Sequence, residues 1–231
     1  MENKMFCYQC QEAAQCTGCT QVGVCGKKPE VANLQDLLRY QTIGLSEITT
    51  RLRAEGTRID REINHIVTVN LFTTITNANF DEEFIADRIL LTQKAKKELA
   101  AKLKDASGLS EAAVWEGHDR AAMDEKAKGV GVLATENEDI RSLRELIIYG
   151  IKGLAAYVKH ANVLGYEKEE IDAFIQEALA KTRDDSLGAD ELVALTLKTG
   201  EFGVAGMALL NDANTETYGN PEMTTVDIGV R

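Results

Sequence analysis

The sequence predicts an all-α protein made of two three-helix bundles behind a cysteine-rich N-terminal segment. Apolar residues recur at helical spacing over most of the chain. Only 2 of the 231 residues are proline and 6% are aromatic, whereas β-sandwiches and barrels need aromatic and β-branched strands separated by turn residues. All five cysteines lie within the first 25 residues, where no helical period is sustained. These three observations place the helices after the cysteine segment.

The composition excludes several classes of protein. The 44% hydrophobic and 27% charged residues are typical of a globular chain. The 26 basic and 37 acidic residues give a net charge of −11, which repels the phosphates of nucleic acids. The longest unbroken apolar run, residues 204–210, is far shorter than the roughly 18 residues that a membrane span needs. The sequence therefore predicts a soluble protein that binds neither nucleic acid nor membrane.

The N-terminus and the cysteines together indicate the compartment. Residues 1–7 lack the basic start, the apolar stretch and the cleavage site of a secretory signal, so we expect a cytoplasmic protein. Cytoplasmic thiols are kept reduced. The five cysteines are therefore predicted to be metal ligands rather than disulfide partners, and their odd number agrees with this.

The first predicted bundle occupies residues 30–108, after the cysteine-rich segment at residues 1–29. Leucines and isoleucines at helical spacing predict its first helix, and Gly56 is typical of a residue that ends one. Residues 77–79 carry a turn signal between the second and third helices. The three helices are predicted at residues 30–52, 60–75 and 81–103. Their short connections indicate antiparallel packing.

A second bundle is predicted in residues 109–213. Residues 34–45 and 143–154 carry leucine or isoleucine, tyrosine and glycine at matching positions, at a constant shift of 109 residues. This match predicts an internal duplication, although two unrelated amphipathic helices can also align over a short stretch. Two further helices are predicted at residues 168–182 and 189–210.

Residues 214–231 are predicted to form an extended tail. Gly219 and Pro221 interrupt any helix, and Val226, Ile228 and Val230 alternate as they would in a strand. Because an unpaired strand edge can pair with another chain, the tail also predicts self-association.

The cysteine spacing points to an iron–sulfur cluster. Cys7/Cys10 and Cys16/Cys19 are C-x2-C pairs, whose tight turn brings two sulfurs together near backbone N–H groups, and Cys25 adds a fifth thiol. Structural zinc sites use the same pairs but usually separate them by roughly 15 to 20 residues. Only five residues lie between Cys10 and Cys16, which favours iron–sulfur over zinc. Cysteines without any metal are the third alternative, and such dense thiols would be prone to oxidation.

Glycines and lysines in the same segment bear on a cluster. Gly18, Gly23 and Gly26 permit the close backbone approach that a cluster-binding loop needs. Lys27 and Lys28 could offset the negative charge of a cluster, or could lie exposed to solvent. The sequence contains no glycine-rich nucleotide loop and no serine-nucleophile motif, so no catalytic residue is predicted.

Several stretches of the sequence resemble a known family. The matching stretches are residues 5–12 (MFCYQCQE), 17–20, 23–27, 32–38, 72–74, 79–81 and 218–222. They are similar to the N-terminal domain of the hybrid-cluster proteins, which are also called prismane proteins and are assigned hydroxylamine reductase activity. The resemblance covers nearly the whole chain. It implies two three-helix bundles and a C-x2-C-x8-C-x5-C pattern of cluster ligands.

Carried onto this sequence, the pattern implies that Cys7, Cys10, Cys19 and Cys25 hold one [4Fe–4S] cluster, with Cys16 left over. The resemblance implies an electron-transfer domain that passes electrons from a redox donor protein to a hybrid iron–sulfur–oxygen cluster. In the full-length family, that second cluster reduces hydroxylamine to ammonia, or reduces nitric oxide. The alternative is a structural or redox-sensing iron–sulfur helical module without catalysis.

The resemblance also implies partners. Chains of this family continue into two α/β domains that bind the hybrid cluster, so the residues that hold it are expected outside this sequence. The missing hybrid-cluster domains or a partner subunit are therefore implied as partners. Hydroxylamine reduction by this chain alone is not implied.

Overall fold

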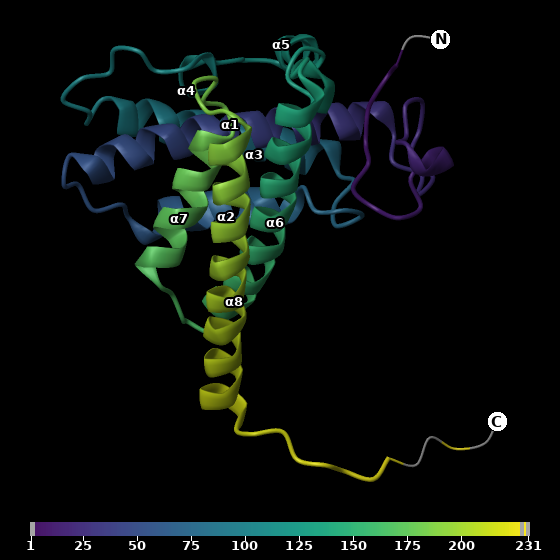
Figure 1. Cartoon of the computed structure of the whole chain (residues 1–231), viewed down its shortest axis with the longest axis vertical. Coiled ribbons are helices and arrows are strands. Elements are labelled where there is room, and N and C mark those ends of the chain that lie inside the picture. The colour runs from purple at the N-terminus through teal and green to yellow at the C-terminus, as the bar shows by residue number, and fades with distance from the viewer. Residues whose placement is uncertain (1–2, 227–228, 230–231) are drawn as a thin grey trace.

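The computed structural model describes residues 3–226 and 229, and this part of the chain is helical (Figure 1). It contains eight α-helices and two short 3₁₀ helices, and none of the described residues belongs to a strand. An isolated antiparallel bridge pairs Cys7 with Cys19. The predicted all-α class is therefore confirmed.

The first three long helices are α1 (Pro29–Ala54), α2 (Arg61–Thr73) and α3 (Glu82–Ala100). α1 is buried along most of its length because its leucines repeat at helical spacing and pack against its neighbours. The Asn70 side chain of α2 donates to the hydroxyl of Thr42 on α1 at 3.0 Å and to that of Thr92 on α3 at 2.8 Å. These hydrogen bonds satisfy the buried Asn70 amide and link the three helices.

The second set of long helices repeats the order of the first, and its first two helices repeat the lengths of their counterparts. It comprises α6 (Glu138–Val163), α7 (Glu169–Lys181) and α8 (Ala189–Tyr218). α1 and α6 each have 26 residues, and α2 and α7 each have 13. α6 packs along α8 as α1 packs along α3. The repeat agrees with the two predicted three-helix units, while their origin by duplication stays a prediction.

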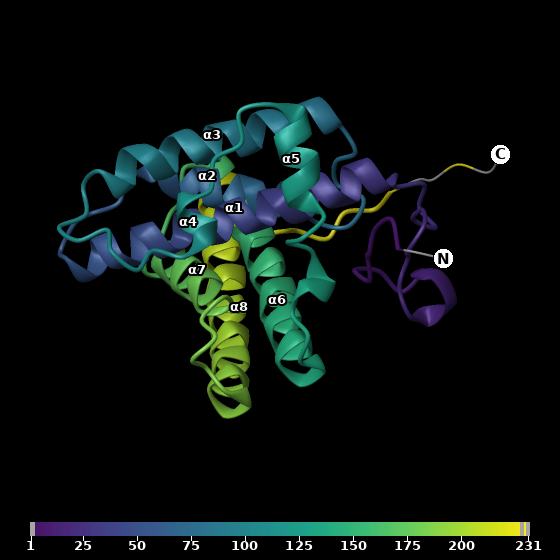
Figure 2. The same cartoon turned by 90° about the horizontal axis from the view of Figure 1, so that it is seen from above.

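The two helical units share one core. α7 packs on α1 and α2 packs on α6, so each unit contributes its second helix to the first helix of the other. Buried side chains from both units, among them Ile48, Leu71, Ile151 and Ile175, form one continuous hydrophobic cluster. Figure 2 shows α6 and α8 crossing the direction of α1 and α3. The units therefore form one packed body.

Two short helices, α4 (Glu111–Val114) and α5 (Arg120–Ala127), precede α6 and pack on α1. The sequence analysis assigned residues from 109 onward to the second bundle, whereas α4 and α5 pack on α1, a helix of the first unit. Gly44 has no side chain, which lets the backbone of Ala112 approach α1 closely. The buried Lys96 ammonium donates to the carbonyl oxygens of Ala112 at 2.7 Å and Trp115 at 3.0 Å, and so holds the segment in place.

The last helix is longer than predicted. We expected it to end at Leu210, whereas α8 continues to Tyr218. Ala213 is fully buried, and the Tyr166 hydroxyl donates to the Glu216 carboxylate at 2.6 Å, so tertiary contacts support this last part. The extended tail therefore starts after Tyr218 rather than at Asn214.

The predicted strand of the tail is only partly described. Val226 is exposed and belongs to no strand. Ile228 and Val230 lie outside the described residues.

By length and composition alone, α8 could cross a membrane, and 28% of its most apolar stretch is buried in the structure. The sequence analysis considered only the unbroken apolar run at residues 204–210, which is too short to indicate a membrane span. A core helix of a bundle passes the same test, so one such helix is weak evidence of a membrane span. Leu192, Leu195 and Leu209 are buried in the shared core.

The buried Asp172 of α7 predicts a pH-dependent stability. Its side chain is 4% exposed, and burial together with Glu169 and Glu167 raises its pKa to about 7. Because this pKa lies above that of the unfolded chain, the free energy of unfolding falls as the pH rises from about 4 to about 7. At pH 8, Asp172→Asn should therefore increase the free energy of unfolding by at least about 1.4 kcal/mol, the value of one pKa unit.

Urea unfolding at pH 5 and pH 8 measures this effect. The gain from Asp172→Asn should be larger at pH 8, whereas Asp212→Asn, at an exposed position of α8, should change the free energy of unfolding little at either pH. An equal gain at both pH values would contradict the assignment.

Candidate metal centre

The cysteine segment lies at the N-terminal end of α1 (Figure 1). The main-chain N–H of Cys7 donates to the carbonyl of Cys19 at 3.1 Å, and the N–H of Cys19 donates to the carbonyl of Cys7 at 2.8 Å. Met5, Cys19 and Ala32 form a small buried cluster beneath this pairing. The backbone therefore brings together one cysteine from each of the two C-x2-C pairs.

Cys16 and Cys19 differ in their surroundings although they belong to the same pair. The Cys19 side chain is buried, and its sulfur accepts a hydrogen bond from the main-chain N–H of Ala14 at 3.4 Å. Cys16 is exposed, ends the 3₁₀ turn Ala14–Cys16, and has a φ of 59°. Cys19 thus has the environment of a ligand, and Cys16 lies on the outside.

The other two predicted ligands lie in separate turns. Cys10 is half-buried and Cys25 is exposed. A side chain added at Gly23 would come within 3.1 Å of the Cys25 sulfur, which explains the glycine there. Within the described residues, no three Cys, His, Asp or Glu side chains are placed to hold a single metal ion.

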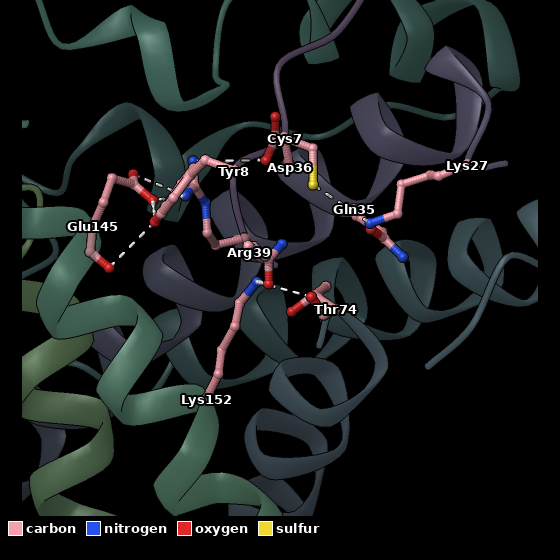
Figure 3. Close-up of polar contacts among 10 residues, drawn as sticks. Cys7, Tyr8, Lys27, Gln35, Asp36, Arg39, Thr74, Glu145 and Lys152 are labelled. Atoms are coloured by element: carbon pink, nitrogen blue, oxygen red, sulfur yellow. Dashed lines mark hydrogen bonds and ion pairs between the residues drawn. The ribbon is translucent and has the colours of Figure 1, made fainter. Parts of the chain in front are cut away.

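The two adjacent lysines of the segment lie in opposite environments. Lys28 is exposed, whereas Lys27 is 1% exposed and turns toward the cysteines. The Lys27 Nζ lies 4.0 Å from the Cys7 sulfur and donates to Gln35 Oε1 at 2.7 Å (Figure 3). It also lies 5.7 Å from the centre of the Phe80 ring. None of these partners is a carboxylate, so within the described part of the chain the buried ammonium forms no ion pair, although Asp36 is close enough to interact with it electrostatically.

A buried polar network adjoins the cysteine segment (Figure 3). Arg39 Nη1 donates to both carboxylate oxygens of Glu145, at 2.9 and 2.7 Å, and the Tyr8 hydroxyl donates to the same carboxylate at 3.0 Å. Burial, opposed by Arg39, raises the pKa of Asp36 to about 6. Burial and the neighbouring Arg39 lower the pKa of Lys152 to about 7.

The sequence analysis did not single out this network. Asp36 and Arg39 are three residues apart on α1, and Glu145 and Lys152 are seven apart on α6, so each pair shares a helix face. Charged residues on the otherwise apolar faces of these two helices were the only sign in the sequence of a buried polar network. Tyr8, which donates to Glu145, is 137 residues from it along the chain, and no local pattern could show this contact.

The residues of this site fit an anionic iron–sulfur cluster. A buried ammonium needs a negative partner to offset its loss of hydration. Cysteine thiolates are negative, they are the form that binds metal, and Lys27 faces the sulfur of one of them. Cys19 also accepts the kind of N–H···S bond that surrounds cluster sulfurs.

The chain is similar to proteins of one known family over nearly its whole length. A model of the Prismane/CO dehydrogenase family matches residues 5–231. Hydroxylamine reductase from Desulfovibrio desulfuricans is 63% identical over 230 residues, covering 100% of this chain and 42% of that protein. The hydroxylamine reductases from Clostridium perfringens and Acetivibrio thermocellus are each 54% identical, over 233 and 227 residues, covering 98% of this chain and 42% of each relative.

The chain therefore spans less than half the length of these curated relatives. Within that part the match is continuous, and the resemblance predicted from the cysteine-rich stretches is confirmed. Because the family model matches nearly the whole sequence, the chain belongs to the Prismane/CO dehydrogenase family.

Proposed function

We propose that this chain is the cluster-binding, electron-transfer part of a cytoplasmic hydroxylamine reductase. The observation that carries the proposal is the buried Lys27, whose ammonium faces the Cys7 sulfur and forms no ion pair with any carboxylate that the structure describes. A fixed cation beside a cysteine sulfur favours an anionic group there. The relatives that match the whole chain bear the name hydroxylamine reductase, which supports proposing that activity for a full-length protein that contains this chain.

Each residue of the site has a defined part in this proposal. Cys7, Cys10, Cys19 and Cys25 bind the metal as thiolates, and Cys16 remains free of it. When bound, a [4Fe–4S] cluster supplies one-electron transfer, at a potential set by its charge, its burial and the hydrogen bonds to its sulfurs. Lys27 offsets negative charge, and the Ala14 N–H donates to the Cys19 sulfur. No residue of this chain is assigned to proton transfer with substrate.

The proposed partners follow from the length of the relatives. A redox donor protein would supply electrons to the cysteine segment. The remaining part of a full-length relative, more than half of its length, would receive them and carry the reduction of hydroxylamine to ammonia, or of nitric oxide, at a hybrid cluster.

Stepwise reduction and reoxidation of the protein, prepared without oxygen, tests this function. We expect the visible absorbance and the electron paramagnetic resonance (EPR) signal to cycle reversibly with one electron per cluster. An intact cluster that cannot be reduced and reoxidised would contradict an electron-transfer role. If removing that cluster also lowered the thermal stability, a structural iron–sulfur module would be the better description.

Replacing Lys27 with methionine should have opposite effects on the metal-free and cluster-loaded protein. Without the cluster, Lys27→Met removes an ammonium buried without a carboxylate partner and should raise the melting temperature. With the cluster, it removes a cation that stabilises the more negative reduced state, and the midpoint potential should fall. Lys28→Met, at the exposed neighbouring position, is the control. Equal shifts in potential for the two variants would argue against a specific role for Lys27.

A further inference from the structure

One face of α6 contacts the turn between the first two predicted ligands. Glu145, Tyr149 and Lys152 are four and three residues apart, so their side chains leave the helix on the same side. All three reach Tyr8 or Gln9, the two residues between Cys7 and Cys10 in the sequence. Figure 3 shows the contact between Glu145 and Tyr8. α6, a helix of the second unit, thus faces the Cys7–Cys10 turn near the N-terminus.

Each α6 side chain makes a hydrogen bond to the turn. The Tyr8 hydroxyl donates to the Glu145 carboxylate at 3.0 Å. The Tyr149 hydroxyl donates to the main-chain carbonyl of Gln9 at 3.1 Å. The Lys152 ammonium donates to Gln9 Oε1 at 3.2 Å. Both residues between the two cysteines are therefore fixed, one of them through its backbone.

Two of the three α6 side chains, Glu145 and Lys152, are themselves held by other parts of the core, whereas Tyr149 is 50% exposed. Arg39 of α1 binds both oxygens of Glu145, and the two side chains are 8% and 13% exposed. Lys152 is 6% exposed and also donates to the carbonyl of Thr74, just after α2, at 2.9 Å. A buried, doubly bonded side chain has little rotamer freedom. Through Glu145 and Lys152 the turn is thus tied to the packed core, and Tyr149 adds a bond from a half-exposed side chain.

We propose that Glu145, Tyr149 and Lys152 are positioning residues, which set the orientation of the Cys7–Cys10 turn toward the cluster through Tyr8 and Gln9. The inference rests on the proposed function and adds residues to it. In a C-x2-C turn the main-chain N–H groups point at the sulfurs, and these N–H···S bonds tune the potential. A loosened turn therefore alters the electronic state of the cluster even when all four thiolates remain bound.

Two variants test the inference on the cluster-loaded chain. Tyr149→Phe removes a single hydroxyl and leaves the charge unchanged, and Lys152→Met removes the bonds to Gln9 and Thr74. Both should shift the midpoint potential and change the EPR signal of the reduced cluster. Both should also release iron to a chelator about fivefold faster, the factor that one hydrogen bond is worth.

Matched controls lie on the same helix. Tyr157→Phe removes the hydroxyl of a partly exposed tyrosine, and Lys159→Met removes an ammonium that sits over the Phe72 ring at 4.9 Å. Neither should change the EPR signal or the rate of iron release. A role in folding alone would lower the melting temperature without changing the EPR signal, so both quantities are measured for every variant.

The outcomes separate this inference from the function on which it rests. If the wild-type chain cycles reversibly but Tyr149→Phe and Lys152→Met match their controls in potential, EPR signal and iron release, the positioning role is overturned and the electron-transfer function stands. If Lys152→Met fails to fold, the neutral Tyr149→Phe still decides the question. A wild-type chain that takes up no cluster would overturn both.

Discussion

Replacing Cys19 with alanine is expected to leave the protein unable to hold an iron–sulfur cluster, whereas replacing Cys16 should leave the cluster in place. The Cys19 side chain is buried, and the backbone pairs it with Cys7 through two hydrogen bonds. Cys16 is exposed at the end of a 3₁₀ turn. Because a [4Fe–4S] cluster needs four thiolates, the loss of a ligand should reduce the iron content from about four per chain to almost none.

Iron and sulfide analysis of the two variants, purified without oxygen, measures this difference. Circular dichroism should show the same helix content in both, because the long helices lie outside the cysteine segment. If Cys16→Ala lost its iron as completely as Cys19→Ala, the assignment of Cys16 as the unused cysteine would be wrong.

The second large effect is expected at Gly44, in the middle of α1. A methyl group at this position would lie 2.0 Å from the carbonyl oxygen of Ala112 and 2.6 Å from the main-chain nitrogen of Ala113. These are backbone atoms, so the clash can be relieved only by moving α4 away from α1. That movement would also weaken the bonds that Lys96 makes to this segment. Gly44→Ala should therefore cost about 3 kcal/mol or more of the free energy of unfolding.

Gly153 provides a matched control, because it occupies the corresponding position of α6 at a shift of 109 residues. A methyl group there would meet no atom within 4 Å. Alanine favours a helix interior over glycine, so Gly153→Ala should increase the free energy of unfolding by about 0.5–1 kcal/mol. Urea unfolding of both variants measures the contrast. A change of the same sign in both would contradict the described contact between α1 and α4.

The long helices could be predicted because their signals are local. The leucines of α1 repeat at helical spacing, and Pro29 and Gly56 mark its two ends, so the predicted range of residues 30–52 differs from the observed Pro29–Ala54 by only a few residues. The same reasoning ended the last helix too early. Residues 211–217 include several weak helix formers, and they are helical because Ala213 is buried and Glu216 accepts the Tyr166 hydroxyl.

The details of the site depend on contacts that no local pattern records. Lys27 and Lys28 are neighbours of the same type, and spacing cannot tell which one turns inward. The choice follows from Gln35 and Phe80, which offer a carbonyl oxygen and a ring face to Lys27 in the folded chain. The contact of Glu145 with Tyr8 likewise joins residues 137 positions apart.

The cysteine pattern was more informative than any helix pattern in the sequence. A C-x2-C pair restricts both the ligand type and the turn geometry, whereas an apolar helix face is common to many folds. The structure adds that Cys19 is buried and that the Lys27 ammonium faces the sulfur of Cys7. The choice of Cys7, Cys10, Cys19 and Cys25 over Cys16 remains a prediction, and the pairing of Cys7 with Cys19 supports it for these two residues.

The most direct test of the central claim is the content of iron, zinc and acid-labile sulfide in the wild-type chain, purified without oxygen. We predict about four iron and four sulfide per chain, as expected for one [4Fe–4S] cluster held by four thiolates. About one zinc per chain without sulfide would contradict both the cluster and the electron-transfer function, and would leave a structural metal domain.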